Sequence, residues 1–321
     1  MGHLPAVEPP LARHQVTRPD AILIAGPTAS GKSAVAFRLA ERLGGTIINA
    51  DSMQVYRELA ILTARPTAEE MAAIPHRLYG TVPARVAYAV GRWLANARSA
   101  IEEAQSDGRL PILTGGTGLY FKALLEGLAP VPDIPDEIRS HWRVQSATLG
   151  PEGLHAELSA RDPAMAARLR PSDPQRIVRA LEVIDATGVS LSEWQGAAGT
   201  PVLPGESVLK LLIAPDREPV YAAIDARFER MVEAGAIEEV EHLLAQGLDR
   251  SLPAMRAHGV PELSAFLVGK ITLDEAKARV KTVTRHYVKR QMTWARRFMS
   301  DWEWLPDGDA AVAAAIASPH S

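Results

Sequence analysis

One stretch, residues 26–33, constrains the fold of this chain more than any other part of its sequence. It reads Gly-Pro-Thr-Ala-Ser-Gly-Lys-Ser, which has the G-x-x-x-x-G-K-S spacing of a phosphate-binding loop. An apolar run at residues 21–25 precedes it, and a helical pattern of apolar residues at 34–43 follows it. The stretch therefore joins a buried strand to a helix, which is the setting that a phosphate-binding loop requires.

Each part of this loop has a physical role in binding a di- or triphosphate. The glycines let backbone N–H groups form a concave nest, and the N-terminus of the following helix adds a partial positive charge. The alternative is a glycine turn before a helix, with no ligand. We expect a phosphate site of the nucleotide-binding type, with Lys32 as a point charge and Ser33 as the ligand of Mg²⁺, made by Gly26, Pro27, Thr28, Ala29, Ser30, Gly31, Lys32 and Ser33.

The segments after this loop alternate between strand and helix patterns. Residues 46–50 predict a second short strand, residues 88–105 an amphipathic helix, and residues 110–114 a third strand. Such alternation is typical of an α/β fold with a parallel sheet. We predict a P-loop NTPase-like, doubly wound parallel sheet whose ligand site lies at the C-terminal ends of the strands.

A change of character in the middle of the chain predicts an insertion. Two proline-rich joints, residues 129–135 and 199–204, bound a segment with charged amphipathic helices and no strand signal. Residues 217–298 are also helical in pattern. The predicted organisation is a disordered leader (1–19), a P-loop α/β core with C-terminal helices (20–131 and 205–305), an inserted helical subdomain (132–204) and a disordered tail (306–321).

Composition limits the compartment and the partners. The chain has 321 residues, of which 47% are hydrophobic, yet no run reaches the roughly 18 apolar residues of a membrane span. It has no cysteine, which excludes a disulfide framework, a thiol nucleophile and a zinc site with Cys ligands. We expect a soluble, cytoplasmic, monomeric protein. The net charge of −3 argues against general coating of nucleic acid, although a local basic face could still bind it.

Asp51 follows the second predicted strand, which places it across the crevice from the phosphate loop in a doubly wound fold. A carboxylate at this position can act as a general base or bind a metal through water. Asp51 with Ser52 also makes a good N-cap for a helix over residues 53–59. The two roles are compatible.

A second glycine-rich loop, residues 114–120, follows the third predicted strand and reads Thr-Gly-Gly-Thr-Gly-Leu-Tyr. Many NTPases carry a Walker-B carboxylate at such a strand end, whereas this loop offers hydroxyls and backbone amides. The difference favours a site that presents hydrogen-bond donors to a second substrate over one built for ATP hydrolysis. A purely structural glycine turn is the alternative.

Two basic stretches are candidate polyanion contacts. Arg176 and Arg179 lie three residues apart on a predicted helix, so they share a face, and Gln175 beside them can hydrogen-bond a base edge. Residues 277–297 contain no acid, and their basic side chains recur around a helix that buries Val280, Val283, Tyr287 and Trp294. Either stretch could instead be a solvated helix face.

These motifs together resemble the bacterial tRNA dimethylallyltransferases, also called tRNA isopentenyltransferases. The resemblance spans residues 21–298 in the family's order. Its most specific parts are the phosphate loop and the run Gly-Gly-Thr-Gly-Leu-Tyr-Phe-Lys-Ala-Leu-Leu-Glu-Gly at residues 115–127. The other matching segments are Asp-Ser-Met-Gln at 51–54, Asp-Pro-Gln-Arg-Ile-Val-Arg-Ala-Leu-Glu at 173–182 and Thr-Arg-His-Tyr-Val-Lys-Arg-Gln-Met-Thr-Trp at 284–294.

The resemblance implies transfer of a dimethylallyl group from dimethylallyl diphosphate to the exocyclic amine of an adenosine. That adenosine lies directly 3′ of the anticodon in tRNAs that read codons beginning with U, and the product is N6-isopentenyladenosine. The phosphate loop would then hold the prenyl diphosphate with Mg²⁺ and would not use ATP, which agrees with the missing Walker-B acid.

The resemblance also assigns roles to single residues. It implies that Asp51 accepts a proton from the adenine amine, that the hydroxyl of Thr117 lines the reaction channel, and that Arg217 neutralises the diphosphate that leaves. Because the target base is stacked in free tRNA, it must flip out to reach the site. The expected contacts with the anticodon stem-loop are Asp51, Ser52, Met53, Gln54, Thr117, Gln175, Arg176, Ile177, Val178, Arg179, Arg285, Lys289 and Arg290.

The sequence departs from the family pattern at three places. Residues 60–66 read Ala-Ile-Leu-Thr-Ala-Arg-Pro, where the family usually has a glycine in place of Leu62 and a lysine in place of Arg65. The usual Gly-Tyr is Gly-Val at 259–260, and the usual His-His pair is His-Arg at 76–77. A P-loop kinase of small metabolites and a non-catalytic RNA-binding module are the alternatives to the prenyltransferase.

Overall fold

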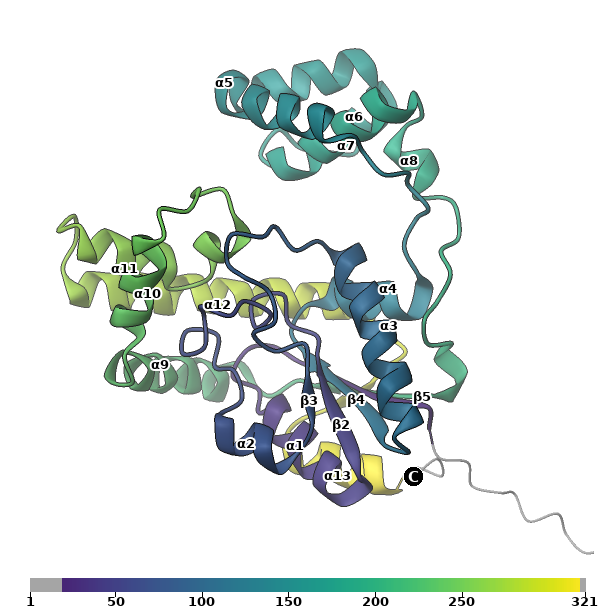
Figure 1. Ribbon diagram of the computed structural model, residues 1–321, viewed down its shortest axis with the longest axis vertical. Coiled ribbons are helices and arrows are strands. Elements are labelled where there is room, and N and C mark those ends of the chain that lie inside the picture. The colour runs from purple at the N-terminus through teal and green to yellow at the C-terminus, as the bar shows by residue number, and fades with distance from the viewer. Residues whose placement is uncertain (1–18, 318–321) are drawn as a thin grey trace, which may run out of the picture. The chain divides into compact units, whose positions relative to one another are not determined.

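The computed structural model describes residues 19–317 of the chain, so the predicted leader, apart from residue 19, lies outside the described residues. A six-stranded parallel sheet forms the centre of one of its two compact units, residues 19–122 and 203–317 (Figure 1). The strand order is β3-β2-β4-β1-β5-β6. The strands are β1 (Ala21–Ala25), β2 (Gly45–Asn49), β3 (His76–Arg77), β4 (Leu110–Gly115), β5 (Val208–Ile213) and β6 (Glu303–Leu305).

The central strands are buried along their whole length, because helices cover a parallel sheet on both faces. All five residues of β1 and of β2 are buried. Strand β1 lies between β4 and β5, and Ala25 pairs with Gly115 on one side and with Leu212 on the other. The C-terminal ends of these three strands therefore meet at one edge of the sheet. The predicted α/β class and the parallel sheet are confirmed.

Helix α1 (Lys32–Leu43) packs on the sheet together with α13 (Gly308–Ala317) (Figure 1). Ala311, Val312 and Ala315 of α13 are buried in the same cluster as Val35 and Leu39 of α1. The expectation of disorder over 306–321 is therefore wrong for α13. Its alanine-rich sequence has high helix propensity and gains an apolar contact with α1. Residues 318–321 lie outside the described part of the chain.

Four helices form a second core beside the sheet, as the helical pattern over 217–298 predicts (Figure 1). Val240, Leu243, Leu263 and Val280 are buried in this core, which also includes residues from the loops after β2. The four helices of this core are α9 (Arg217–Glu233), α10 (Ala236–Ala245), α11 (Val260–Leu267) and α12 (Leu273–Phe298). The same unit also contains α2 (Ala68–Ala73) and α3 (Val90–Ser106).

The other unit, Ala123–Val202, has its own core around Trp142, Leu154 and Leu181. It begins before the predicted boundary at residue 132 and ends near the predicted residue 204. The long helix α5 contains a kink where Gly150 adopts a left-handed φ of 66° before Pro151. Helix α4 (Gly118–Glu126) leads into this unit, which contains α5 (Asp136–Arg161), α6 (Pro163–Ala166), α7 (Pro174–Thr187) and α8 (Leu191–Trp194).

Candidate active site

The phosphate loop has the geometry that its sequence predicts. It begins after β1 and ends where Lys32 starts α1. A Cβ at Gly26 would lie 2.7 Å from the Ser30 hydroxyl and 2.9 Å from the carbonyl of Ile213, so glycine alone fits. Gly31 has a left-handed φ of 84°, and a Cβ there would meet nothing within 4 Å. The loop therefore closes tightly on the sheet and opens beside α1.

Lys32 is positioned to titrate near neutral pH. Its Nζ donates a hydrogen bond to the carbonyl of Pro27 at 3.2 Å. Burial lowers the pKa of Lys32 to about 8; the negative charge of Asp51 opposes this change and the positive charge of Arg227 adds to it. Asp51 and Arg227 therefore both lie within electrostatic reach of the phosphate loop. A bound anion would favour the charged form of the lysine.

The second glycine loop is held by close contacts with two other elements. A Cβ at Gly115 would lie 2.1 Å from the carbonyl of Ala50, and one at Gly116 would lie 2.3 Å from the Gln291 amide nitrogen. At Gly118 it would lie 2.1 Å from the indole nitrogen of Trp294. Packing alone thus explains the glycines, as the structural alternative predicts. Their effect is to bring the loop directly against Asp51.

Asp51 follows β2, and Asn49 organises the turn around it. The side chain of Asn49 accepts a hydrogen bond from Asp51 N at 2.8 Å and donates to the carbonyl of Asp51 at 2.9 Å. Asp51 Oδ1 accepts from Met53 N at 2.9 Å. The expected helix over 53–59 is wrong, because these residues form turns. The capping carboxylate instead fixes a loop, and Asn49 is a site residue that sequence reasoning missed.

Thr117 connects the glycine loop to the loop of Asp51. Its hydroxyl accepts from Ser52 N at 3.0 Å and donates to the Ser52 hydroxyl at 3.3 Å. It also hydrogen-bonds the side chain of Tyr287, whose pKa is raised by burial and by the charge of Asp51. The predicted residues Asp51, Ser52 and Thr117 are therefore brought together, with Tyr287 as a further member.

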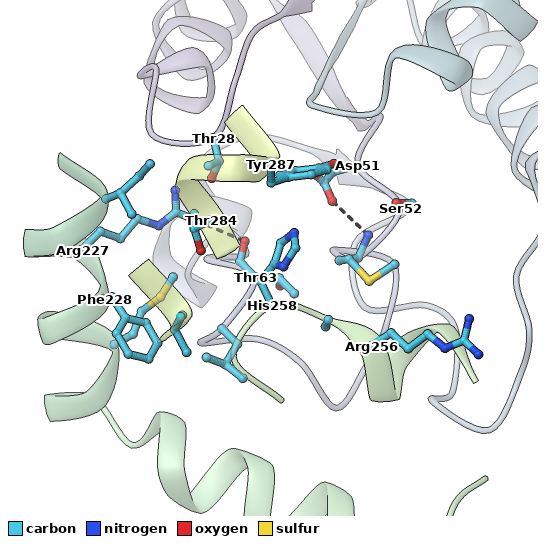
Figure 2. A pocket seen from close by; sticks show the side chains of 16 residues that line it. Thr28, Asp51, Ser52, Thr63, Arg227, Phe228, Arg256, His258, Thr284 and Tyr287 are labelled. Carbon is cyan, nitrogen blue, oxygen red and sulfur yellow. Dashed lines mark hydrogen bonds between the residues drawn. The ribbon is translucent and has the colours of Figure 1, made fainter. Parts of the chain in front are cut away.

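A cavity of about 220 Å³ opens onto Asp51, Ser52 and Tyr287, whereas Thr117 is not among its lining residues (Figure 2). Thr28 of the phosphate loop and Asp51 line it together, while Phe228 contributes to an apolar wall. It thus joins the end of an anion site to a carboxylate and to an apolar surface. The lining residues are Thr28, Asp51, Ser52, Met53, Leu62, Thr63, Ile224, Arg227, Phe228, Met231, Arg256, Ala257, His258, Val280, Thr284 and Tyr287.

Several of these lining residues are titratable groups that sequence reasoning missed, Arg227 and His258 among them. Arg227 of α9 projects into the cavity (Figure 2); burial lowers its pKa, and Asp51 opposes that lowering. His258 lies with its ring centroid 4.8 Å from that of Tyr287, and burial and the charge of Arg290 lower its pKa. Neither residue follows a strand or belongs to a short motif, so no sequence signal placed them at the site.

The predicted arginine Arg217 lies at the same edge of the sheet as the phosphate loop. It is the first residue of α9, shortly after β5, and β5 pairs in parallel with β1. Its side chain is exposed and it is not among the residues that line the cavity. A role in binding the diphosphate stays a prediction for Arg217, whereas Arg227 has the more direct geometry.

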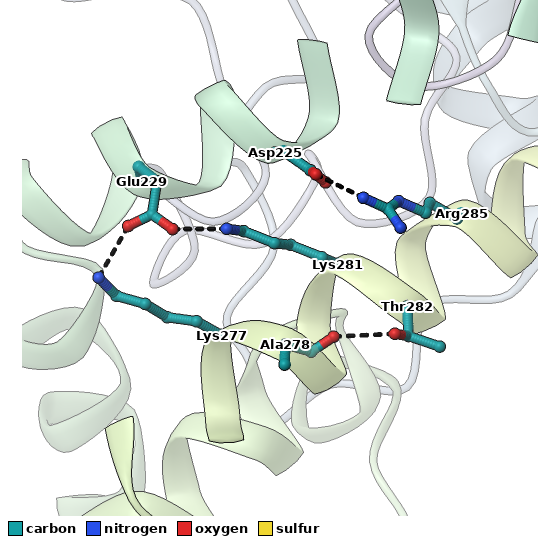
Figure 3. A network of polar contacts seen from close by, with 7 residues as sticks. All are labelled: Asp225, Glu229, Lys277, Ala278, Lys281, Thr282 and Arg285. Carbon is teal, nitrogen blue, oxygen red and sulfur yellow. Dashed lines mark hydrogen bonds and ion pairs between the residues drawn. The ribbon is translucent and has the colours of Figure 1, made fainter. Parts of the chain in front are cut away.

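Part of the basic face of α12 is used inside the protein (Figure 3). Arg285 pairs with Asp225 of α9 and lies 5.4 Å from the ring centroid of Tyr221. Lys277 and Lys281 both bind Glu229, at 2.7 and 2.6 Å. These charges stabilise the α9–α12 contact, so Arg285 is a packing residue in this structure. The other predicted tRNA contacts on α12, Lys289 and Arg290, are exposed.

The predicted contacts on α7 do not all face solvent. Ile177 has an exposed fraction of 0% and Val178 packs against the same core, so the expectation that Ile177 touches RNA is wrong. Gln175 and Arg176 are exposed, and Arg179 is half-buried. Arg176 pairs with Asp173 and Arg179 with Glu182, each at 3.4 Å. Exposed ion pairs of this kind are weak and open readily for a phosphate.

Met53 and Gln54 differ in whether their side chains are already hydrogen-bonded within the protein. Met53 lines the cavity and packs on the second core. The amide nitrogen of Gln54 donates to the carbonyls of Thr63 and Ala64 at 2.9 and 3.0 Å. Its donors are therefore used within the chain, and contact with a base would require these bonds to open.

A phosphate loop, a carboxylate and an apolar wall around one cavity, on a parallel α/β sheet, define a P-loop-type enzyme of group transfer. Residues 54–298 match the IPP transferase family model, and residues 19–84 match the isopentenyl transferase model. The chain therefore belongs to the tRNA dimethylallyltransferase family.

Relatives and solved structures agree with this membership. The tRNA dimethylallyltransferase of Bradyrhizobium sp. (strain ORS 278) is 55% identical over 285 residues, which cover 89% of this chain and 92% of that protein. The full-length tRNA isopentenylpyrophosphate transferase of Bacillus halodurans is 34% identical with a TM-score of 0.65, covering 91% and 93%. A eukaryotic dimethylallyltransferase acting on tRNA is 27% identical with a TM-score of 0.79, covering 92% and 77%.

Two negative findings apply to residues 19–317. No helix there is both long and apolar enough to cross a membrane. Over the same residues, no three His, Asp or Glu side chains are grouped so that they could hold a metal ion.

Proposed function

We propose that this protein transfers the dimethylallyl group of dimethylallyl diphosphate to the exocyclic amine of the adenosine directly 3′ of the anticodon, in tRNAs that read codons beginning with U. The observation that carries the proposal is the shared cavity. Thr28 of the phosphate loop, Asp51 and Phe228 all line it. An anion site, a base and an apolar wall are what a prenyl diphosphate and a purine amine need together.

The reaction forms one bond and breaks one. The amine nitrogen N6 attacks C1 of the dimethylallyl group, and the bond from C1 to the diphosphate oxygen breaks, with the electron pair leaving on the diphosphate. The nitrogen then loses one proton. Because the allylic cation is delocalised, the protein's main task is to stabilise the charge that develops on the diphosphate.

The phosphate loop and its neighbours supply that stabilisation. The N–H groups of the phosphate loop that are not already bonded within the protein and the Lys32 ammonium bind the diphosphate, and Arg227 adds charge from the cavity wall. Ser33 is exposed beside the open Gly31, so it suits a Mg²⁺ ion that the diphosphate also binds. When bound, this ion supplies positive charge to the diphosphate. Arg217 approaches from the same sheet edge.

Asp51 acts on the nucleophile. An aromatic amine is a weak nucleophile, because its lone pair is delocalised into the ring. A carboxylate that accepts a hydrogen bond from the amine increases the electron density on nitrogen and then takes the proton. One oxygen of Asp51 is occupied by Met53 N, which fixes the carboxylate and leaves the other oxygen to the substrate. Thr117 is hydrogen-bonded to Ser52 and Tyr287, and its hydroxyl lies beside the path by which the base reaches Asp51.

The tRNA contacts are proposed on exposed and half-buried positions. The base must flip out of the anticodon loop, at a cost of a few kcal/mol that protein contacts offset. Ser52, Met53 and Gln54 lie near the carboxylate. We propose that Gln175 hydrogen-bonds a base edge and that the phosphate contacts are Arg176, Arg179, Lys289 and Arg290.

Labelled dimethylallyl diphosphate, incubated with the protein, Mg²⁺ and an unmodified anticodon stem-loop, tests the proposal. We expect the label to enter the RNA. A matched stem-loop with guanosine in place of the target adenosine should stay unlabelled. Turnover of ATP with a small acceptor and no RNA labelling would support a metabolite kinase instead and reject the prenyltransferase.

A further inference from the structure

A single carboxylate on α10 holds the segment 59–66 through consecutive backbone groups. Glu239 Oε1 accepts hydrogen bonds from Ala60 N at 2.6 Å and from Ile61 N at 2.8 Å. Glu239 Oε2 accepts a third from Leu62 N at 2.9 Å. Successive N–H groups that point to one place make an anion-binding concavity. Here the protein's own side chain fills that concavity, with charge-assisted bonds.

The same segment forms part of the cavity wall and contacts two proposed substrate-binding side chains. Leu62 and Thr63 line the cavity. The carbonyl of Thr63 accepts a hydrogen bond from Gln54 at 2.9 Å and another from the guanidinium of Arg227 at 3.5 Å. One peptide carbonyl thus orients a side chain beside Asp51 and an arginine on the cavity wall.

The other end of the segment is fixed separately. Arg65 donates to the carbonyls of Tyr56 and Arg57 at 3.2 Å each, and its guanidinium fills the space over Gly80. The guanidinium of Arg65 is therefore hydrogen-bonded to backbone carbonyls. Within the segment, Ala64 has a left-handed φ of 46°, which is uncommon for a residue with a Cβ. The segment also closes on itself, since Ala64 N donates to the carbonyl of Ile61 at 2.9 Å and Arg65 N to that of Ala60 at 3.0 Å. Glu239 supplies the partner for the N–H groups of residues 60–62.

We propose that Glu239 is a positioning residue, which holds residues 60–62 so that the Thr63 carbonyl is presented to both Gln54 and Arg227. The roles of these two side chains rest on the proposed function. Glu239 does not line the cavity and acts through the segment. One loop conformation, held by Glu239, therefore determines both the surface that contacts the diphosphate and the surface beside the acceptor base.

The variant Glu239→Gln tests this at nearly constant volume. A glutamine has one acceptor oxygen, and its NH₂ group would face the N–H groups of the segment, so at least one amide loses its partner. The matched control is Glu238→Gln, which removes the neighbouring charge of the same helix from an exposed side chain. Hydrogen exchange measured by mass spectrometry over residues 59–66 reports the loop directly.

We expect exchange of this segment to be about 10-fold faster in Glu239→Gln than in the control, because at least one amide N–H of the segment loses its hydrogen-bond partner. The dissociation constant for dimethylallyl diphosphate, measured by calorimetry without tRNA, should rise about 5- to 20-fold. Unchanged exchange and unchanged donor affinity would overturn the proposal. Slower folding or a lower Tm with unchanged donor affinity would also overturn it, since that is a purely structural role.

A second variant covers the case in which Glu239→Gln does not fold. Glu239→Asp keeps the charge but withdraws it by one methylene, so exchange and donor affinity should change in the same directions by a smaller factor. No change in either would contradict the proposal. These readouts do not involve RNA, so absence of RNA prenylation by the unmodified protein would reject the proposed function and leave the loop measurements interpretable.

Discussion

The backbone N–H of Thr28 in the phosphate loop donates a hydrogen bond at 3.0 Å to the side-chain carbonyl of Gln291 on α12. The amide nitrogen of the same glutamine donates to the carbonyl of Gly116 at 2.9 Å. One side chain therefore joins the phosphate loop to the glycine loop beside Asp51. We therefore expect the spacing between the two loops to depend on this bridge.

Replacing the bridging amide should weaken donor binding. In Gln291→Leu both hydrogen bonds are lost, each worth about 1 kcal/mol, so we expect the KM for dimethylallyl diphosphate to rise about 5- to 30-fold. Thr293→Ala is the control, since this exposed hydroxyl bonds only within its own helix among the contacts described. Steady-state kinetics on a stem-loop substrate measure both. An unchanged KM would mean that the two loops hold their places without Gln291.

Removing the carboxylate of Asp51 should affect turnover more than binding. Asp51→Ala takes away the proton acceptor, and loss of a general base lowers kcat by about 10²- to 10⁴-fold. The affinity for inorganic pyrophosphate, measured by calorimetry, should change by less than about 3-fold. Equal losses in kcat and in pyrophosphate affinity would indicate that Asp51 binds the metal or the anion instead.

The pKa of Lys32 predicts how donor affinity depends on pH. Lys32 in the free protein has a pKa of about 8, so it is charged at pH 7 and mostly neutral at pH 9. Because the charged form binds an anion, affinity should fall as pH rises through 8, by up to about 10-fold between pH 7 and 9. Calorimetry with inorganic pyrophosphate at several pH values checks this.

Lys32→Arg provides the control for this titration, since arginine stays charged over the whole range. Its pH profile reports the ionisation of pyrophosphate and of the remaining groups. A profile identical to that of the unmodified protein would exclude Lys32 as the titrating group.

Sequence reasoning found those parts of the site that depend on local order along the chain. The phosphate loop, Asp51 and Thr117 each follow a buried strand, and parallel strands bring such residues to one edge. Arg227 and His258 come from helices and turns that reach the cavity through packing in the second core. Their place depends on helix orientation, which no local pattern encodes.

The places where the structure adds to or departs from the sequence prediction have physical causes of the same kind. Ile177 was included with its basic neighbours on α7, although a helix turns every 3.6 residues and must bury one face. Arg285 is basic like Lys289, yet the acid that neutralises it lies on another helix, 60 positions earlier in the chain. Periodicity predicts which residues are buried. It does not predict which distant charges meet.

The pair formed by Asp225 and Arg285 should contribute to stability. Asp225→Ala leaves the Arg285 guanidinium half-buried without its acid, and we expect the free energy of unfolding to fall by about 1–3 kcal/mol. Urea unfolding followed by circular dichroism measures it. Arg285→Ala should destabilise to a similar degree, and the double variant should cost less than the sum of the two. Strictly additive losses would show that the two charges do not interact.

The two arginines of α7, exposed Arg176 and half-buried Arg179, should act on tRNA through its phosphates. Arg176→Ala with Arg179→Ala removes two charges whose present partners, Asp173 and Glu182, form weak exposed pairs. We expect the slope of log K against log salt for stem-loop binding to fall in magnitude by about 1 to 2, since each phosphate contact contributes about 0.7 to 0.9. Affinity for pyrophosphate should not change. Fluorescence anisotropy across a salt series measures the slope, and an unaltered slope would show that this helix face is solvated and touches no phosphate.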